Sequence, residues 1–150
     1  MAKYKIVHYI NQFFAGIGGE EKADYTPELR EGVVGPGMGL KAALGEDYEI
    51  VSTIICGDNY FGENLDAATD TIIEMVKKCE PDVFVAGPAF NAGRYGVACG
   101  TICKSVWASR LSPVCISRIL AWICSARTLS LWIHLTPQPV CQRYFLLCPL

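Results

Sequence analysis

The sequence lacks a long apolar run, an excess of charge of one sign, and an apolar leader. Its 150 residues carry 13 Lys and Arg against 15 Asp and Glu, a net charge of −2, so no basic surface for nucleic acid or an anionic membrane is expected. No uncharged apolar stretch reaches the ~18–20 residues of a membrane span, and no export signal follows Met1. We therefore expect a cytoplasmic protein whose eight cysteines are thiols.

The last 44 residues lack acids, glycine and lysine altogether, yet they contain all three Trp. Residues 1–106 hold 9 basic and 15 acidic residues, a net charge of −6, whereas residues 107–150 hold four Arg, a net charge of +4. The second segment shows no clean period of 3.6 or 2, and its Arg residues are too scattered for an amphipathic membrane or partner surface. We predict one folded domain over 1–106 and an irregular, non-native tail over 107–150.

Residues 1–106 show alternating strand and helix patterns. Strands are predicted at 4–10, 48–55 and 82–86, a loop at 56–62, and helices at the end of 35–44, at 65–79 with Asn64 as N-cap, and from Arg94 to about Val106. This order predicts an α/β fold, a parallel sheet with helices on both faces, of the doubly wound, flavodoxin- or Rossmann-like class. Ligands in such folds bind at the carboxyl ends of the strands.

Several motifs are better explained by structure than by chemistry. The glycine-rich loop 16–19 lacks dinucleotide-binding spacing and is predicted to form tight turns. Cys99 and Cys103 lie four apart on one helix face with no histidine nearby, so no metal site is predicted. His8, inside a strand, is interpreted as a structural histidine. Cys56, at the start of a strand-end loop, is kept as a candidate reactive thiol.

Arg94 is the leading candidate for ligand binding. It follows Asn91 at the start of a helix that leaves a strand-end loop, where a guanidinium beside backbone N–H groups suits a carboxylate. The alternative is a surface arginine paired with an acidic neighbour. Asp58, Asn59 and Tyr60, in the preceding strand-end loop, are open to the same two interpretations.

Four ungapped segments carry a resemblance to a known family. Residues His8–Ala23, Glu31–Gly37, Cys56–Asn64 and Ala86–Gly96 closely resemble the selenoprotein subunit of component B of the glycine/sarcosine/betaine reductases, in family order and over about residues 3–106. The resemblance implies a cytoplasmic oxidoreductase of anaerobic, amino-acid-fermenting bacteria. In that family, component B binds a small amino-acid substrate and activates its C–N bond for reductive cleavage.

The resemblance also implies partners and cofactors. A partner subunit of component B carries a pyruvoyl group that engages the amino substrate, the carboxymethyl group passes to a selenocysteine on component A, and component C releases acetyl phosphate. The family protein is much longer, and its own selenocysteine lies beyond the end of this chain. We therefore assign no catalytic residue, metal or bound cofactor here and expect the chain alone to be inactive. The resemblance and the loop positions together give the candidate substrate-binding residues Arg94, Asn91, Tyr95, Asp58, Asn59, Tyr60, Asn11, Gln12 and Glu20.

A non-enzymatic alternative remains open. The same α/β domain would serve as a module that binds a small ligand or a partner protein. Titration with glycine, sarcosine and betaine separates the two hypotheses. The sequence does not decide which of the three is the substrate, nor the oligomeric state.

The genetic code offers a test of the tail. Codons permitted from Trp107 to Cys115, taken in a shifted frame, include Gly-Ile-Pro-Val-Val-Thr-Gly-Met-Tyr, and further readings restore acids and glycines that resemble the family's own continuation. We therefore hypothesise that residues from about Val106 onward are a frameshift translation, which was not selected to fold. Its exposed apolar content is expected to pack poorly.

Overall fold

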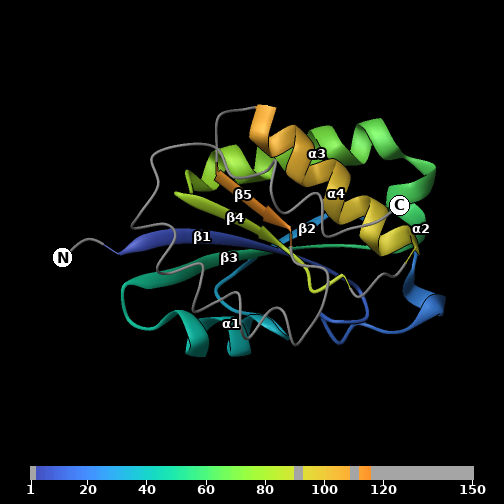
Figure 1. The fold of residues 1–150 in the computed structure, drawn as a ribbon. Helices are drawn as coiled ribbons and strands as arrows, with labels where there is room; N and C mark the ends of the chain where they lie inside the picture. The colour runs from blue at the N-terminus through green and yellow to red at the C-terminus, as the bar shows by residue number, and fades with distance from the viewer. Residues whose placement is uncertain (1–2, 90–92, 109–111, 116–150) are drawn as a thin grey trace.

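A mixed β-sheet with helices on both faces forms the fold of the chain, seen here in a computed structural model (Figure 1) that describes residues 3–89, 93–108 and 112–115. The strands are β1 (Tyr4–Asn11), β2 (Glu28–Glu31), β3 (Tyr48–Cys56), β4 (Val83–Ala86) and β5 (Ser112–Cys115). The helices are α1 (Gly37–Leu44), α2 (Asp58–Glu63), α3 (Leu65–Cys79) and α4 (Gly93–Ala108), with a 3₁₀ turn, η1, at Glu20–Lys22.

The sheet has the strand order β2-β3-β1-β4-β5. Strands β3, β1, β4 and β5 are parallel, as the alternation of strands and helices predicted, but β2 pairs antiparallel with β3. The expectation of an all-parallel sheet is therefore wrong at this edge. The strand escaped prediction because it is short and polar: Glu28, Arg30 and Glu31 give it the charged character of a protected edge strand.

The three predicted strands and three predicted helices are all present, and their ends agree with the prediction to within two residues. The predicted loop over 56–62 is wrong, because β3 runs through Cys56 and α2 begins at Asp58. Asn64 stands before α3 as predicted, but its side-chain amide donates to the Tyr60 carbonyl of α2 and does not cap α3. Helix α3 ends at Glu80, which has a left-handed φ of 46°, immediately before Pro81.

Two elements extend beyond the predicted boundary at Val106. Helix α4 continues to Ala108, and β5 pairs with β4 as a parallel edge strand. The sequence analysis predicted no strand in this region, because four residues are too short for a period-2 pattern. The rest of the predicted tail, 109–111 and 116–150, lies outside the described residues.

A register shift between β1 and β3 changes which side chains of β3 point to each face of the sheet. Ile6 lies opposite Ile50, but Val7 lies opposite Ser52, so β3 carries one extra residue, Val51, at this point. Because side chains alternate along a strand, one extra residue exchanges the two faces of β3. Ile50 therefore packs on the face covered by α1, whereas Ile54 packs on the opposite face.

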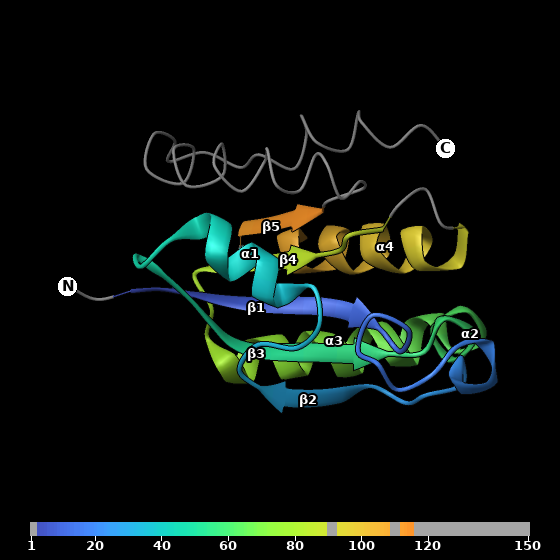
Figure 2. The same ribbon diagram turned by 90° about the horizontal axis from the view of Figure 1, so that it is seen from below.

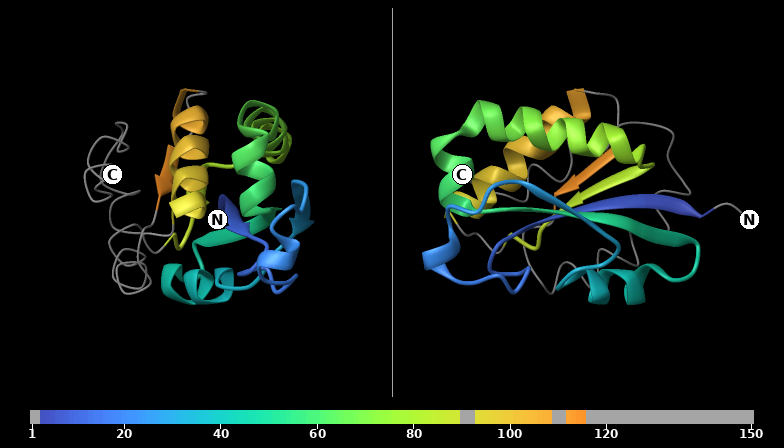
Figure 3. Two further views of the ribbon diagram at one scale, coloured as in Figure 1. Left: turned by 90° about the vertical axis from the view of Figure 1, so that its right-hand side faces the viewer. Right: turned by 180° about the vertical axis from the view of Figure 1, so that it is seen from behind.

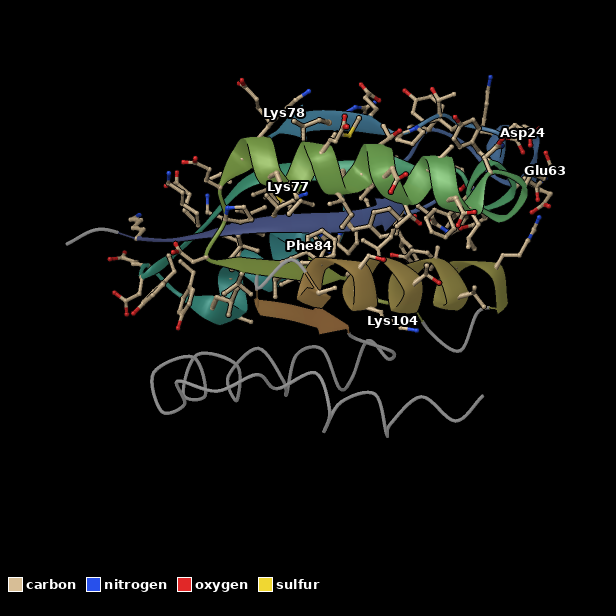
Figure 4. The ribbon with its side chains drawn as sticks, turned by 90° about the horizontal axis from the view of Figure 1, so that it is seen from above. Asp24, Glu63, Lys77, Lys78, Phe84 and Lys104 are labelled. Atoms are coloured by element: carbon tan, nitrogen blue, oxygen red, sulfur yellow. The ribbon has the colours of Figure 1, made fainter. Side chains whose placement is uncertain are left out.

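Helices α3 and α4 lie side by side over one face, and α1 covers the other (Figures 2 and 3). Helix α3 meets the sheet through Ala68, Ile72 and Val76, the apolar stripe that spacings of three and four predicted. Phe84 of β4 lies beneath this helix pair (Figure 4) and is completely buried. Within the described part of the chain, no helix combines the length and apolar character needed to cross a membrane.

Candidate functional site

An open cleft of about 420 Å³ lies where the chain leaves β1 and β3 and enters α4. These points are at the carboxyl ends of parallel strands, where α/β sheets bind ligands. The cleft is lined by Asn11, Gln12, Phe13, Phe14, Gly19, Glu20, Asp58, Gly93, Arg94 and Tyr95. Six of these are residues that the sequence analysis named, drawn from three segments that are remote from one another in the chain.

Asn11 and Gln12 tie the end of β1 to the start of α2. The Asn11 side-chain amide donates to Asp58 Oδ2 at 3.0 Å, and its oxygen accepts the Phe14 N–H at 3.0 Å. The Gln12 oxygen accepts the Asp58 N–H at 3.2 Å, and its amide donates to the Gly19 carbonyl at 3.3 Å. Asn11 and Gln12 are buried, at 5% and 2% exposure. They therefore act first as the supports that fix Asp58 and the glycine-rich loop around the cleft.

Arg94 at the start of α4 reaches across to both other segments. Its Nη2 donates to Glu20 Oε1 at 2.6 Å and to Glu20 Oε2 at 2.8 Å, and its Nη1 donates to Asn59 Oδ1. The Arg94 side chain is 49% exposed and that of Glu20 is 70% exposed. Arg94 therefore pairs with an acidic neighbour, as one of the two sequence-based interpretations has it, and it also lines the cleft. Its role in ligand binding stays a prediction.

Close backbone packing positions the segments that carry Glu20 and Asp58. A Cβ on Gly57 would lie 2.1 Å from the Ala23 carbonyl oxygen, so only glycine fits there. Gly57 and Asn59 donate their N–H groups to Tyr25 and Ala23 carbonyls at 2.7 and 2.9 Å. The chain that follows η1 is thus held against the start of α2.

The electrostatic environment of the cleft acts most clearly on Asp58. Burial raises the pKa of its carboxyl above the ordinary value, and this effect outweighs the Asn11 hydrogen bond and the positive charge of Arg94, which lower it. Asp58 Oδ1 is buried and accepts no hydrogen bond from any described residue.

An aromatic wall, Phe13, Phe14 and Tyr95, completes the cleft. Phe14 lies edge-on to Phe13, with ring centroids 5.6 Å apart, and tilted against Tyr95 at 5.8 Å. Tyr95 is 1% exposed, whereas Phe13 is 64% exposed. Sequence reasoning did not single out the two phenylalanines, although their position directly after the polar end of β1 was the available signal.

Other predicted residues lie elsewhere. Tyr60 is half-buried against the core and does not line the cleft. Cys56 is the buried last residue of β3 rather than part of a loop, and burial raises its pKa to about 12, which speaks against a reactive thiolate. Asn91 lies outside the described residues. His8 is fully buried, with Nε2 2.7 Å from the Gly87 carbonyl oxygen, which fits the predicted structural role.

The described residues do not form a metal or redox centre at this cleft. No cluster of three or more His, Cys, Asp or Glu suited to a metal ion occurs within the described ranges. No cysteine is among the residues that line the cleft. The polar groups that line the cleft are one guanidinium, two carboxylates and two amides, beside an aromatic wall.

Comparisons with known proteins show the family of this chain. The chain is 68% identical over 106 residues to the sarcosine reductase complex component B subunit beta of Peptoclostridium acidaminophilum. It is 60% identical over 106 residues to the glycine reductase complex component B subunit gamma of Peptoclostridium litorale, and 51% identical over 113 residues to the betaine reductase complex component B subunit beta of P. acidaminophilum.

These matches cover 71%, 71% and 75% of this chain but 24%, 24% and 26% of the relatives, so the chain spans about a quarter of their length. No solved structure matches the chain. The family model described as glycine/sarcosine/betaine reductase selenoprotein B matches residues 3–119, and the chain belongs to this family.

Proposed function

We propose that the cleft binds the zwitterionic amino-acid substrate of a component B reductase, with Arg94 on its carboxylate. The observation that carries this proposal is the meeting of a guanidinium with two carboxylates in one cleft at the carboxyl ends of the strands. Glycine, sarcosine and betaine each carry one carboxylate and one positive nitrogen, so a cleft with both signs of charge matches all three. The parallel strand order β3-β1-β4-β5 supports a doubly wound, flavodoxin-like arrangement, in which such clefts bind ligands.

The positive nitrogen faces the other side of the cleft in this proposal. Asp58, which lines the cleft, offers the negative charge of its carboxylate. Phe13, which is 64% exposed, and the half-buried Phe14 offer aromatic rings, which attract ammonium groups with or without N–H donors. The wall therefore suits N-methylated substrates as well as glycine.

Reductive cleavage of the C–N bond needs groups that this chain does not supply. None of the described residues that line the cleft is a cysteine, and we derive no chemical step from them. In the proposed complex, the pyruvoyl-bearing partner subunit and the selenocysteines of component B and component A provide the chemistry, in the cytoplasm of the cell. The part played by this chain is to bind and orient the substrate.

Titration with the three substrates tests the binding role. We expect Arg94→Ala to weaken substrate affinity by about tenfold, because a charge-assisted hydrogen bond to the carboxylate is lost. Arg30→Ala is the matched control, since Arg30 is paired with Glu28 on the edge strand β2 and does not line the cleft. Equal affinities of the Arg94 variant and the parent chain would remove Arg94 from the site. Binding of none of the three substrates would favour a module for another ligand or a partner protein.

A complementation assay tests the activity. When this chain replaces the full-length subunit in a reconstituted reductase, we expect no substrate-dependent acetyl phosphate. Formation of acetyl phosphate would show that the chain contains all that the reaction requires of this subunit, and would overturn the assignment of a binding role alone.

We also propose that residues 107–150 are a frameshifted translation joined to the domain. Identity to the two reductase relatives quoted first extends over 106 of the 150 residues, and the family model reaches residue 119. Sequencing the encoding DNA across codons 100–150 tests this: an inserted or deleted base near codon 106, with a long open frame in the shifted register, is expected. An intact frame ending at Leu150 would contradict it.

A further inference from the structure

The guanidinium of Arg94 in the cleft is already bound to a carboxylate of the chain itself, that of Glu20. Both oxygens of Glu20 accept hydrogen bonds from Arg94 Nη2, at 2.6 and 2.8 Å. A glycine-like ligand would present the same chemical group to the same nitrogen. Asn59 accepts a hydrogen bond from Nη1 on the other arm of the guanidinium. A ligand carboxylate that binds Nη2 therefore has to displace Glu20 from that nitrogen.

The Glu20 contact is one that a ligand can displace. The Glu20 side chain is 70% exposed and that of Arg94 is 49% exposed, so water solvates and screens the pair. No other partner of the Glu20 carboxylate is recorded within the described ranges, whereas its backbone is fixed in η1 by hydrogen bonds around Gly19 and Ala23. Rotation of one side chain therefore clears Nη2, without movement of the backbone.

We propose that Glu20 occupies the carboxylate subsite of the empty cleft and acts as an internal competitor, which the carboxylate of the substrate displaces. The inference rests on the proposed function. It assigns Glu20 a role opposite to that of a substrate ligand: its charge lowers the apparent affinity for a carboxylate by the fraction of molecules in which Nη2 is occupied. It also explains why a substrate-binding arginine is found in an ion pair.

Substitution of Glu20 tests the sign of this effect. In the full chain, Glu20→Gln and Glu20→Ala should bind sarcosine about 1.5- to 5-fold more tightly, the range that an exposed ion pair allows. Glycinamide, which has the ammonium but no carboxylate, should bind no more tightly to either variant than to the parent chain. NMR titration supplies both affinities and follows the Arg94 side-chain N–H signal, which should shift on sarcosine binding in the parent chain.

Glu21→Gln is the matched control. It removes the same charge from the adjacent residue, whose carboxylate accepts the Gly19 N–H at 2.9 Å and does not contact Arg94. We expect no gain for this variant. Equal gains for the Glu20 and Glu21 variants would reduce the effect to general electrostatics, and weaker sarcosine binding by Glu20→Gln would make Glu20 a support for Arg94; either result overturns the inference.

Arg94→Ala separates this inference from the function it rests on. If that variant loses affinity while the Glu20 variants gain none, the carboxylate subsite stands and the competition fails. If Arg94→Ala binds sarcosine as the parent chain does, the proposed function itself fails at this residue.

Discussion

The two faces of the sheet differ in how much they bury. Among the described residues, the cluster under α3 and α4 contains 17 buried residues, whereas the cluster under α1 contains seven. Helix α1 has only eight residues, and its Met38 is 65% exposed. The larger cluster also includes Tyr95, which lines the cleft. Tyr95 thus joins the cleft to the larger of the two clusters.

Substitution of one isoleucine on each face of β3 should give the largest loss of stability, and it tests directly how much each face of the sheet contributes. The residue types match, since Ile54 lies in the larger cluster and Ile50 in the smaller one, on opposite sides of the register shift. Both changes to Ala should destabilise the fold within the range of about 2–5 kcal/mol, Ile54→Ala near the top and Ile50→Ala near the bottom. Urea unfolding measures both free energies. A larger loss of unfolding free energy for Ile50→Ala than for Ile54→Ala would show that the face under α1 contributes more to stability than the face under α3 and α4.

The α1 face contains a buried histidine that makes stability depend on pH. Burial lowers the pKa of His8 to about 4, despite the hydrogen bond to the Gly87 carbonyl, which raises it. As the pH falls, His8 is protonated first in the unfolded chain, where its pKa is the ordinary 6.5. The neutral, buried His8 therefore contributes its full share of the free energy of unfolding above pH 6.5, and this share is lost as the pH falls to about 4. The expected loss is about 3 kcal/mol.

Unfolding free energies measured across this pH window check the prediction. His8→Gln should flatten the dependence between pH 6.5 and 4, because the titrating group is gone. His134→Gln, which removes the other histidine of the chain, is the control and should retain it. Parallel curves for the parent chain and the His8 variant would show that His8 is not buried in its neutral form.

A smaller loss is expected where the cleft meets the core. Asn11→Ala removes the hydrogen bonds to Asp58 and to the Phe14 N–H, which should cost about 1–2 kcal/mol of stability. Asn64→Ala, which loses one exposed hydrogen bond to Tyr60, should stay within about 0.5 kcal/mol. Thermal unfolding of the Asn11→Ala and Asn64→Ala variants shows which of them loses more stability. Equal small effects would mean that the buried network around Asp58 adds no stability.

Substitution of Arg94 should have the smallest effect on stability, although we expect it to have the largest effect on substrate binding. Arg94→Ala should leave the unfolding midpoint unchanged, because its ion pair with Glu20 is exposed to solvent. Circular dichroism gives the midpoint, and the same sample can be titrated with substrate. A clear drop in the midpoint would instead assign Arg94 a structural role in joining the loop and α4.

The candidate site was predicted in part from sequence. Arg94, Asp58, Asn11 and Gln12 were named because they follow strands, and parallel strands bring their carboxyl ends to one edge. Tyr60 was also named, but its side chain packs toward the core. The sequence did not reveal this, because the position of a residue in a loop or short helix does not give the direction of its side chain. Phe13 and Phe14 were missed for the same reason.

The sequence by itself determined the α/β class and the order of three strands, β1, β3 and β4, and three helices, α1, α3 and α4. It did so because apolar periodicity, glycine and proline act locally along the chain. Tertiary structure alone decided the antiparallel edge strand β2, the exchange of faces at Val51, and the pairing of Arg94 with Glu20, 74 residues away. These features depend on which distant segments meet. A local pattern carries no information about that, whereas hydrogen bonding and packing between segments do.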